Sequence, residues 1–141
     1  MTSTPAPRGD DLEVVQRVLA HPTWAVVGLR DNPARAAYRV ARFLQGKGRR
    51  IVPVHPRAQD VHGETAYATL ADIPFPVDVV DVFVNSSLAG DIADQAVAVG
   101  ARAVWFQLDV VDGEAADRVR AAGLDMVMDR CPVIEWRTAA P

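Results

Sequence analysis

Short apolar runs alternate with longer segments of helical periodicity along this chain of 141 residues. Apolar runs of this length, bounded by turn residues, are typical of strands that are covered on both faces. We therefore predict strands at Trp24–Val27, Arg50–Val54, Val77–Val84, Ala103–Gln107 and Leu124–Met128. Ala66 and Tyr67 are a candidate for a further short strand.

Helical periodicity fills the segments between these runs. A leading helix is expected from Asp10, which has capping-box spacing to Glu13, up to His21-Pro22. The other predicted helices are Arg35–Gly46, a turn near Leu70, a helix from Ser86 or Ser87 to Val99, and Asp112–Ala122. The expected buried stripe of the helix that reaches Val99 consists of Leu88, Ile92, Ala96 and Val99.

Strands and helices in this alternation predict an α/β fold with right-handed crossovers. We expect a three-layer, Rossmann-like architecture in which a mostly parallel sheet of five to six strands has helices on both faces. Residues 10–137 are expected to form a single domain, between a disordered tail at residues 1–9 and a C-terminal tail at residues 138–141.

The composition narrows the class of partner. The net charge of −3 argues against nucleic acid, which usually requires a basic surface. Cys131 is the only cysteine, and no cluster of Cys and His suggests a metal site. No apolar run reaches the length of a membrane span, so we expect a cytoplasmic protein without a membrane partner.

The topology indicates where a ligand would bind. Open parallel sheets bind ligands at the carboxyl ends of their strands, where the strand order reverses. With the order 3-2-1-4-5, this switch point lies between the strands that end at Gly28 and Val84. Gly28 would allow a phosphate to approach the backbone or the next helix to pack closely, and Asn32 would cap that helix or contact a ligand. Arg30 would clamp a phosphate or remain solvated.

The sequence contains neither the dinucleotide-binding motif of a dehydrogenase nor another familiar catalytic motif. The turn after the first strand holds one glycine in place of G-x-G-x-x-G, and Val54 is followed by His55-Pro56 where an acidic residue would bind the ribose of NAD. His21 is expected to be structural, whereas His62 is expected to lie in a flexible loop without a function. Asp81 is either a perturbed acid or a hydrogen-bonded structural carboxylate, and Cys131 is either a reactive thiol or a small packed residue.

Five segments in order resemble the small stand-alone CoA-binding proteins, which are similar to the N-terminal domain of the succinyl-CoA synthetase α subunit. They are Ala25-Val-Val-Gly-Leu-Arg-Asp-Asn-Pro33 with Tyr38-Arg-Val40, Ile51-Val-Pro-Val-His-Pro56, Val77-Asp-Val-Val-Asp-Val-Phe83, Ala103-Val-Trp-Phe-Gln107 and Val127-Met-Asp-Arg-Cys131. The resemblance covers roughly Thr23 to Trp136. It implies a Rossmann-like domain that binds coenzyme A without catalytic machinery of its own.

The resemblance also implies roles for individual residues. The loop of Gly28, Leu29, Arg30 and Asn32 would hold the pyrophosphate, and Tyr38 would support that turn. The adenosine end would lie near Val54, His55 and Pro56. The pantetheine path would pass Phe83, Val84, Asn85 and Gln107. The helix face itself suggests Arg35 or Arg39 for the 3′-phosphate.

The chain departs from the family pattern at four places. Arg30 stands where relatives often have a small hydroxyl residue, and Val84-Asn85 stands where they often have an arginine. Asp109 takes the place of a usual glycine, and Trp136 takes the place of a usual histidine. The missing arginine and the added carboxylate would weaken an anion site, whereas Arg30 would compensate. Weak CoA binding and a changed ligand therefore both remain open.

The leading hypothesis is non-catalytic binding of coenzyme A or an acyl-CoA. The alternatives are the CoA-binding subunit of an NDP-forming acyl-CoA ligase and an NAD(P)-binding redox-sensing module. An apolar C-terminus of Val133, Ile134 and Trp136 suggests a homodimer, and an unidentified protein partner is the other possibility.

Overall fold

Five strands alternate with helices along the chain in this computed structural model, which describes residues 8–139. The elements are α1 (Arg8–Leu19), β1 (Thr23–Val27), α2 (Ala36–Gly46), β2 (Arg50–Val54), the 3-10 turn η1 (Leu70–Asp72), β3 (Val79–Val82), α3 (Ser86–Ala98), β4 (Ala103–Phe106), α4 (Gly113–Ala121), β5 (Asp125–Val127) and α5 (Pro132–Ala139). None of the helices within these residues is long and apolar enough to cross a membrane.

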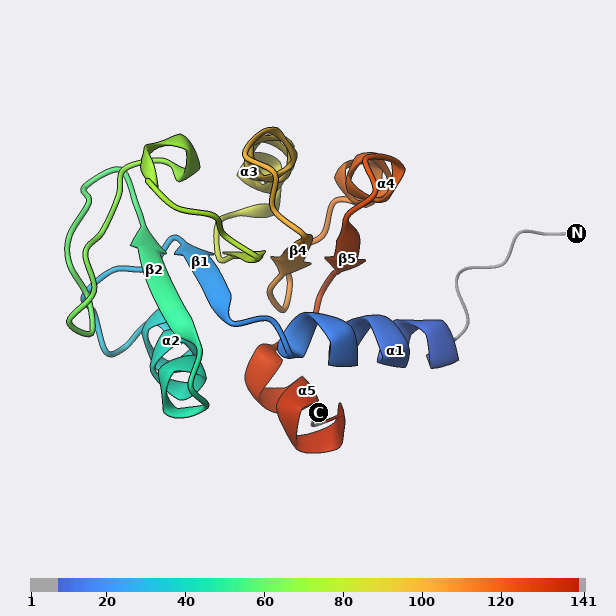
Figure 1. Cartoon of the computed structure of the whole chain (residues 1–141), viewed down its shortest axis with the longest axis horizontal. Coiled ribbons are helices and arrows are strands. Elements are labelled where there is room, and N and C mark those ends of the chain that lie inside the picture. Colours follow the sequence, from blue (N-terminus) through green and yellow to red (C-terminus); the bar gives the residue numbers. More distant parts are fainter. Residues whose placement is uncertain (1–7, 140–141) are drawn as a thin grey trace, which may run out of the picture.

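The strands form one parallel sheet in the order β2-β1-β3-β4-β5. Figure 1 shows three layers, with α3 and α4 on one side of the sheet and α1, α2 and α5 on the other. Tyr67 extends the sheet beyond β2 through a single bridge to Val54. The predicted fold class, the parallel direction and the switch point between β1 and β3 are thus confirmed.

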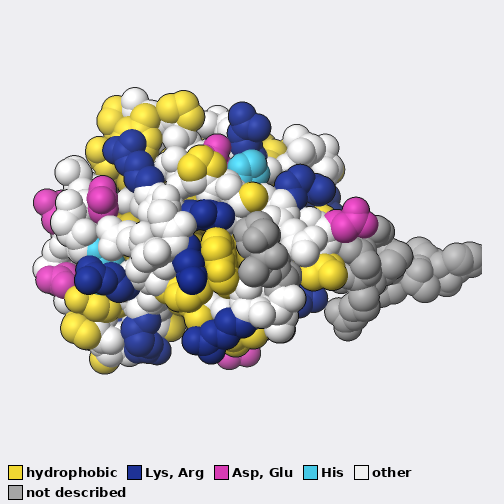
Figure 2. Space-filling view, turned by 60° about the horizontal axis from the view of Figure 1, so that its bottom comes forward, with side chains coloured by type: hydrophobic (Ala, Val, Ile, Leu, Met, Phe, Trp, Pro, Cys, Tyr) yellow, Lys and Arg dark blue, Asp and Glu magenta, His cyan; other side chains and the backbone are white. Residues whose placement is uncertain are grey.

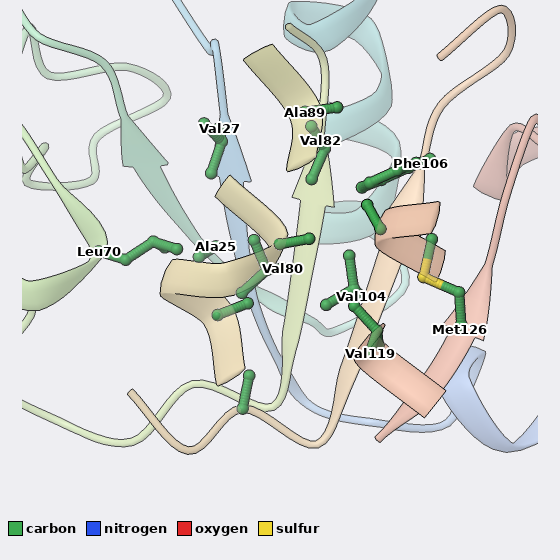
Figure 3. Close-up of a cluster of buried hydrophobic side chains, with 14 of the residues drawn as sticks. Ala25, Val27, Leu70, Val80, Val82, Ala89, Val104, Phe106, Val119 and Met126 are labelled. Atoms are coloured by element: carbon green, nitrogen blue, oxygen red, sulfur yellow. The ribbon is translucent and has the colours of Figure 1, made fainter. Parts of the chain in front are cut away.

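Alternate residues of the strands enter two separate cores, as the pleat requires. Figure 3 shows the core under α3 and α4, where Val80, Val82, Val104 and Phe106 project from the sheet. The opposite core contains Trp24, which packs beside Trp105 with ring centroids 5.8 Å apart. Both faces of every strand are covered, which explains why the strands are apolar throughout.

The predicted buried stripe of α3 is confirmed for Ala96 and wrong for Leu88 and Val99. Small residues, Ala89, Ala93 and Ala96, face the sheet, whereas Leu88 is 58% exposed and Val99 39% exposed. Alanine side chains let the helix backbone lie close to the valine-rich sheet, so the packing favours them over the larger apolar side chains. The cap differs too, because Asn85, and neither predicted serine, accepts the hydrogen bond from Ser87 N–H.

The two ends of the domain also differ from the prediction. Helix α1 begins at Arg8, two residues before the expected Asp10, and the rest of the predicted N-terminal tail lies outside the described residues. Helix α5 was not predicted, and it continues to Ala139, so the expected domain boundary at residue 137 falls inside it.

Helix α5 removes the reason for predicting a homodimer. Val133 and Trp136 are partly buried against the core, and Trp136 meets Phe43 of α2 edge-on at 6.0 Å between ring centroids. Arg49 lies over the Trp136 ring at 4.7 Å. Figure 2 looks towards this side of the molecule, where Lys and Arg side chains lie among the apolar ones. Only Ile134 of the three supposedly exposed residues is largely exposed.

Candidate functional site

Gly28 brings the carboxyl ends of β1 and β3 unusually close together. Its φ is +98°, and a Cβ at this position would lie 3.2 Å from the backbone oxygen of Phe83. Gly28 N–H donates to Val54 O on the other side, so the turn is fixed between both neighbouring strands. The close approach that was expected towards the following helix is therefore made to Phe83 after β3, and a side chain at position 28 would be strained and would press on Phe83.

A cleft of about 500 Å³ opens above this turn, at the switch point. Eight of the predicted site residues line it: Gly28, Arg30, Arg35, Val54, His55, Pro56, Phe83 and Val84. The remaining lining residues are Val27, Ala68, Thr69 and Leu70, together with Leu88, Asp91, Ile92 and Gln95 of α3. Its volume is in the range of small-molecule and cofactor sites.

The loops after β1 and β2 make one end of the cleft cationic. Burial, followed by the nearby charges of Arg30 and Arg57, lowers the pKa of His55 below its ordinary value of 6.5. His55 Nδ1 accepts a hydrogen bond from Arg57 N–H at 3.1 Å. The neutral imidazole therefore carries its proton on Nε2, which leaves a second donor beside the two guanidinium groups.

A polar depression adjoins this end of the cleft. It is lined by Arg30, Asp31, Asn32, Arg57 and Gln59, so Arg30 belongs to both spaces. Asn32 is a predicted site residue that lines only this depression, and its Oδ1 accepts from Ala34 N–H, which shapes the turn before α2. Sequence reasoning missed Arg57 and Gln59, although both closely follow the highlighted His55-Pro56 turn.

Several other predicted site residues have structural contacts instead. Leu29 is fully buried in the core beneath α2. The Tyr38 and His62 rings pack at a tilt of 56° with centroids 4.2 Å apart, and His62 Nε2 lies 2.9 Å from Tyr38 O. This contact ties the loop after β2 to α2, so His62 has a structural role that the expected flexible loop did not include. Arg39 donates to Pro33 O and Ala34 O, so of the two candidate arginines only Arg35 lines the cleft.

Asn85 and Gln107 also lie outside the lining. Asn85 caps α3, and Ser86 links the neighbouring loops by donating to Asp109 O and accepting from Val111 N–H. Gln107 is buried, and its Oε1 has no hydrogen-bond partner among the described residues. The structure therefore brings together the predicted loops after β1 and β2, but not the predicted end of β4.

Asp81 is fully buried in the middle of β3. Neither carboxylate oxygen has a hydrogen-bond partner within residues 8–139, so the expectation of a hydrogen-bonded structural carboxylate is wrong. Burial raises its pKa well above the ordinary value of 3.8. In register it lies between Val26 and Trp105, away from the cleft lining. Cys131 is buried in the same core, as expected of a small packed residue.

The departure at Asp109 has a backbone explanation. Asp109 has φ of +69°, a region that glycine adopts most easily and that Asp tolerates better than most residues. Its N–H donates to Asp129 Oδ1 at 2.7 Å, which holds the turn. The Asp109 side chain is exposed and does not line the cleft, so its charge affects the site only from a distance.

Residues 22–137 match the model of the family described as the CoA binding domain. The chain belongs to this family. It is 34% identical to the uncharacterized protein YneT of Bacillus subtilis over 107 residues, which cover 76% of this chain and 79% of YneT. A hypothetical protein from Pyrococcus horikoshii is 32% identical, with a TM-score of 0.88 and 100% coverage of both chains.

The same fold also occurs within a larger protein. The dinucleotide forming acetyl-coenzyme A synthetase 1 of Ca. Korarchaeum cryptofilum is 20% identical, with a TM-score of 0.70. The match covers 82% of this chain but 28% of the synthetase. At this identity the likeness shows the shared fold.

Proposed function

We propose that this protein binds coenzyme A or an acyl-CoA in the cleft at the switch point, and that it contributes no catalytic group of its own. The observation that carries the proposal is the cationic end of the cleft, where Arg30, Arg57 and the His55 Nε2 donor converge beside the Gly28 turn. Charged donors to phosphate are stronger than neutral ones, and Arg matches phosphate oxygens with two parallel donors.

The number of cations favours coenzyme A over NAD. Coenzyme A carries a pyrophosphate and a 3′-phosphate, whereas NAD carries only the pyrophosphate. Arg35 lines the same cleft, so three arginines, Arg30, Arg35 and Arg57, border the two adjoining spaces, against two carboxylates, Asp31 and Asp91. The acidic residue that binds the NAD ribose is replaced by His55, which supports the same choice.

The test is calorimetric titration with coenzyme A, acetyl-CoA and 3′-dephospho-CoA, together with NADH fluorescence. Binding of coenzyme A with weaker binding of the dephospho form supports the proposal. Absence of heat and of a thermal shift at millimolar coenzyme A overturns it, and NADH binding in its place would support the redox-sensing alternative.

Arg30→Ala is the informative variant for this test. Losing one charge-assisted contact of about 1.5–3 kcal/mol lowers affinity roughly 10- to 100-fold. Arg42→Ala is the matched control, because Arg42 is exposed on α2 and lines neither space. Equal affinity of both variants would show that the phosphates do not lie at Arg30.

A further inference from the structure

The polar depression beside the cleft is lined by two loops that follow neighbouring strands. Arg30, Asp31 and Asn32 follow β1, and Arg57 and Gln59 follow β2. Because β1 and β2 are parallel and adjacent, as Figure 1 shows, both loops leave the sheet at the same edge. The depression has a volume of about 590 Å³, which leaves room for a phosphate group beside a ribose ring.

Backbone hydrogen bonds hold both loops in place. In the turn after β2, Ala58 N–H donates to His55 O at 2.7 Å, and Ala58 has φ of +48°. Arg57 N–H donates to His55 Nδ1 in the same turn. In the loop after β1, Asn32 N–H donates to Arg30 O at 2.8 Å. The two arginines are therefore attached to ordered turns, which lowers the entropic cost of ordering them around a ligand.

Arg30 and Arg57 are available to an anionic ligand. Neither guanidinium group forms an ion pair within residues 8–139. Asp31 is the only carboxylate among the described residues that line the depression, so the two arginines leave this lining with a net positive charge. Arg binds phosphate oxygens with two parallel donors, and the amide of Gln59 adds a neutral donor to the same lining.

The connectivity of coenzyme A matches the two adjoining spaces. Its ribose carries the pyrophosphate on C5′ and a further phosphate on C3′, so two anionic groups flank one sugar. Arg30 borders both spaces, whereas Arg57 borders only the depression and Arg35 only the cleft. His55 and Pro56, near which the resemblance places the adenosine, line the cleft and immediately precede Arg57 in the chain. An adenosine at that place carries its 3′-phosphate beside Arg57, while the pyrophosphate stays beside Arg30.

We propose that the depression is the subsite for the 3′-phosphate, and that Arg57, assisted by Gln59, makes the protein select coenzyme A over 3′-dephospho-CoA. This assignment differs from the expectation from the sequence, which gave the role to Arg35 or Arg39. Arg39 donates to two backbone oxygens of the loop before α2, and Arg35 does not border the depression. The inference rests on the proposed binding of coenzyme A in the adjoining cleft.

The experiment measures the affinities for coenzyme A and 3′-dephospho-CoA by calorimetric titration in the wild type and in Arg57→Ala. The wild type should bind coenzyme A at least tenfold more tightly, which is the size of one charge-assisted contact. In Arg57→Ala the preference should fall below threefold, because binding of coenzyme A weakens while the affinity for 3′-dephospho-CoA changes less than twofold. Arg57 is exposed, so its replacement leaves the core intact, and thermal denaturation verifies this.

Arg35→Ala is the matched variant, because Arg35 is an exposed arginine that borders only the cleft. It should keep the tenfold preference even if both affinities fall. The subsite is overturned by equal wild-type binding of the two ligands, by a preference that survives in Arg57→Ala, or by a preference lost in Arg35→Ala; each of these results leaves binding of coenzyme A established. Absence of any binding of coenzyme A would instead refute the proposed function and this inference together.

Discussion

The buried carboxyl group of Asp81 should make stability fall as the pH rises. Burial raises the pKa of this group in the folded protein well above 3.8, so the folded state holds the proton more tightly than the unfolded chain. Its contribution to stability is therefore fully present below about pH 3.8 and is lost as the pH rises towards the folded pKa. Trp105 cannot relieve the burial, because its indole N–H already donates to Arg130 O.

The expected size of this effect follows from linkage. Between the two pKa values, one proton released on unfolding changes the free energy of unfolding by about 1.4 kcal/mol per pH unit. A rise of two pH units within that interval therefore costs about 3 kcal/mol, a large part of the roughly 5–15 kcal/mol that is typical of a domain.

The assay is urea denaturation of the wild type and Asp81→Asn from pH 4 to pH 8. Asparagine cannot ionise, so the difference in unfolding free energy between the two proteins isolates the Asp81 carboxyl from all other titrating groups. At pH values above the ordinary pKa and below the folded pKa of Asp81, that difference should change by about 1.4 kcal/mol per pH unit, with the wild type losing stability relative to the variant. Asp117→Asn, at an exposed site, should give a nearly constant difference.

A constant difference for Asp81→Asn across this range would refute the reasoning. It would mean that the Asp81 carboxyl ionises in the folded protein as easily as in the unfolded chain, which is incompatible with an unpaired carboxylate in this core.

Three further predictions concern the loops that build the site. Gly28→Ala should lower stability by about 2 kcal/mol, because Ala is strained at positive φ and its Cβ would press on Phe83; a shift below about 0.5 kcal/mol in urea denaturation would contradict this. Asn85→Ala should lower the free energy of unfolding by about 1 kcal/mol, measured by thermal denaturation. Asn85→Asp keeps the acceptor for Ser87 N–H and should leave stability nearly unchanged, so equal losses in the two variants would argue against the helix cap. Binding of coenzyme A should strengthen from pH 8 to pH 5.5 more in the wild type than in His55→Asn, because a bound anion raises the lowered pKa of His55. Parallel calorimetric profiles of the two proteins over this pH range would exclude a contact between His55 and a phosphate.

The sequence was sufficient to predict the sheet and its switch point. Strands covered on both faces must be apolar throughout, and parallel strands joined by helices allow few topologies, so runs such as Trp24–Val27 could be identified without any knowledge of their neighbours. The predicted residues of the loops after β1 and β2 line the cleft for the same reason, because the carboxyl ends of adjacent strands must meet.

Sequence periodicity misplaced residues whose surroundings depend on distant elements. Leu88 and Ile92 have the spacing of a core stripe, yet they line the cleft, because the small residues of α3 allow the closest packing on the sheet. Trp136 was expected at an exposed C-terminus, and Phe43 of α2 and Arg49 cover it.

The amino-acid sequence by itself determined which segments are strands and how they connect, and it predicted the loops that line the cleft. Only the tertiary structure decided which face of α3 meets the sheet, that Arg57 lies close enough to lower the pKa of His55 together with Arg30, and that Asp81 has no partner within the described residues. Local patterns reflect the periodicity of a single element, whereas these features depend on packing between elements that are far apart in the chain.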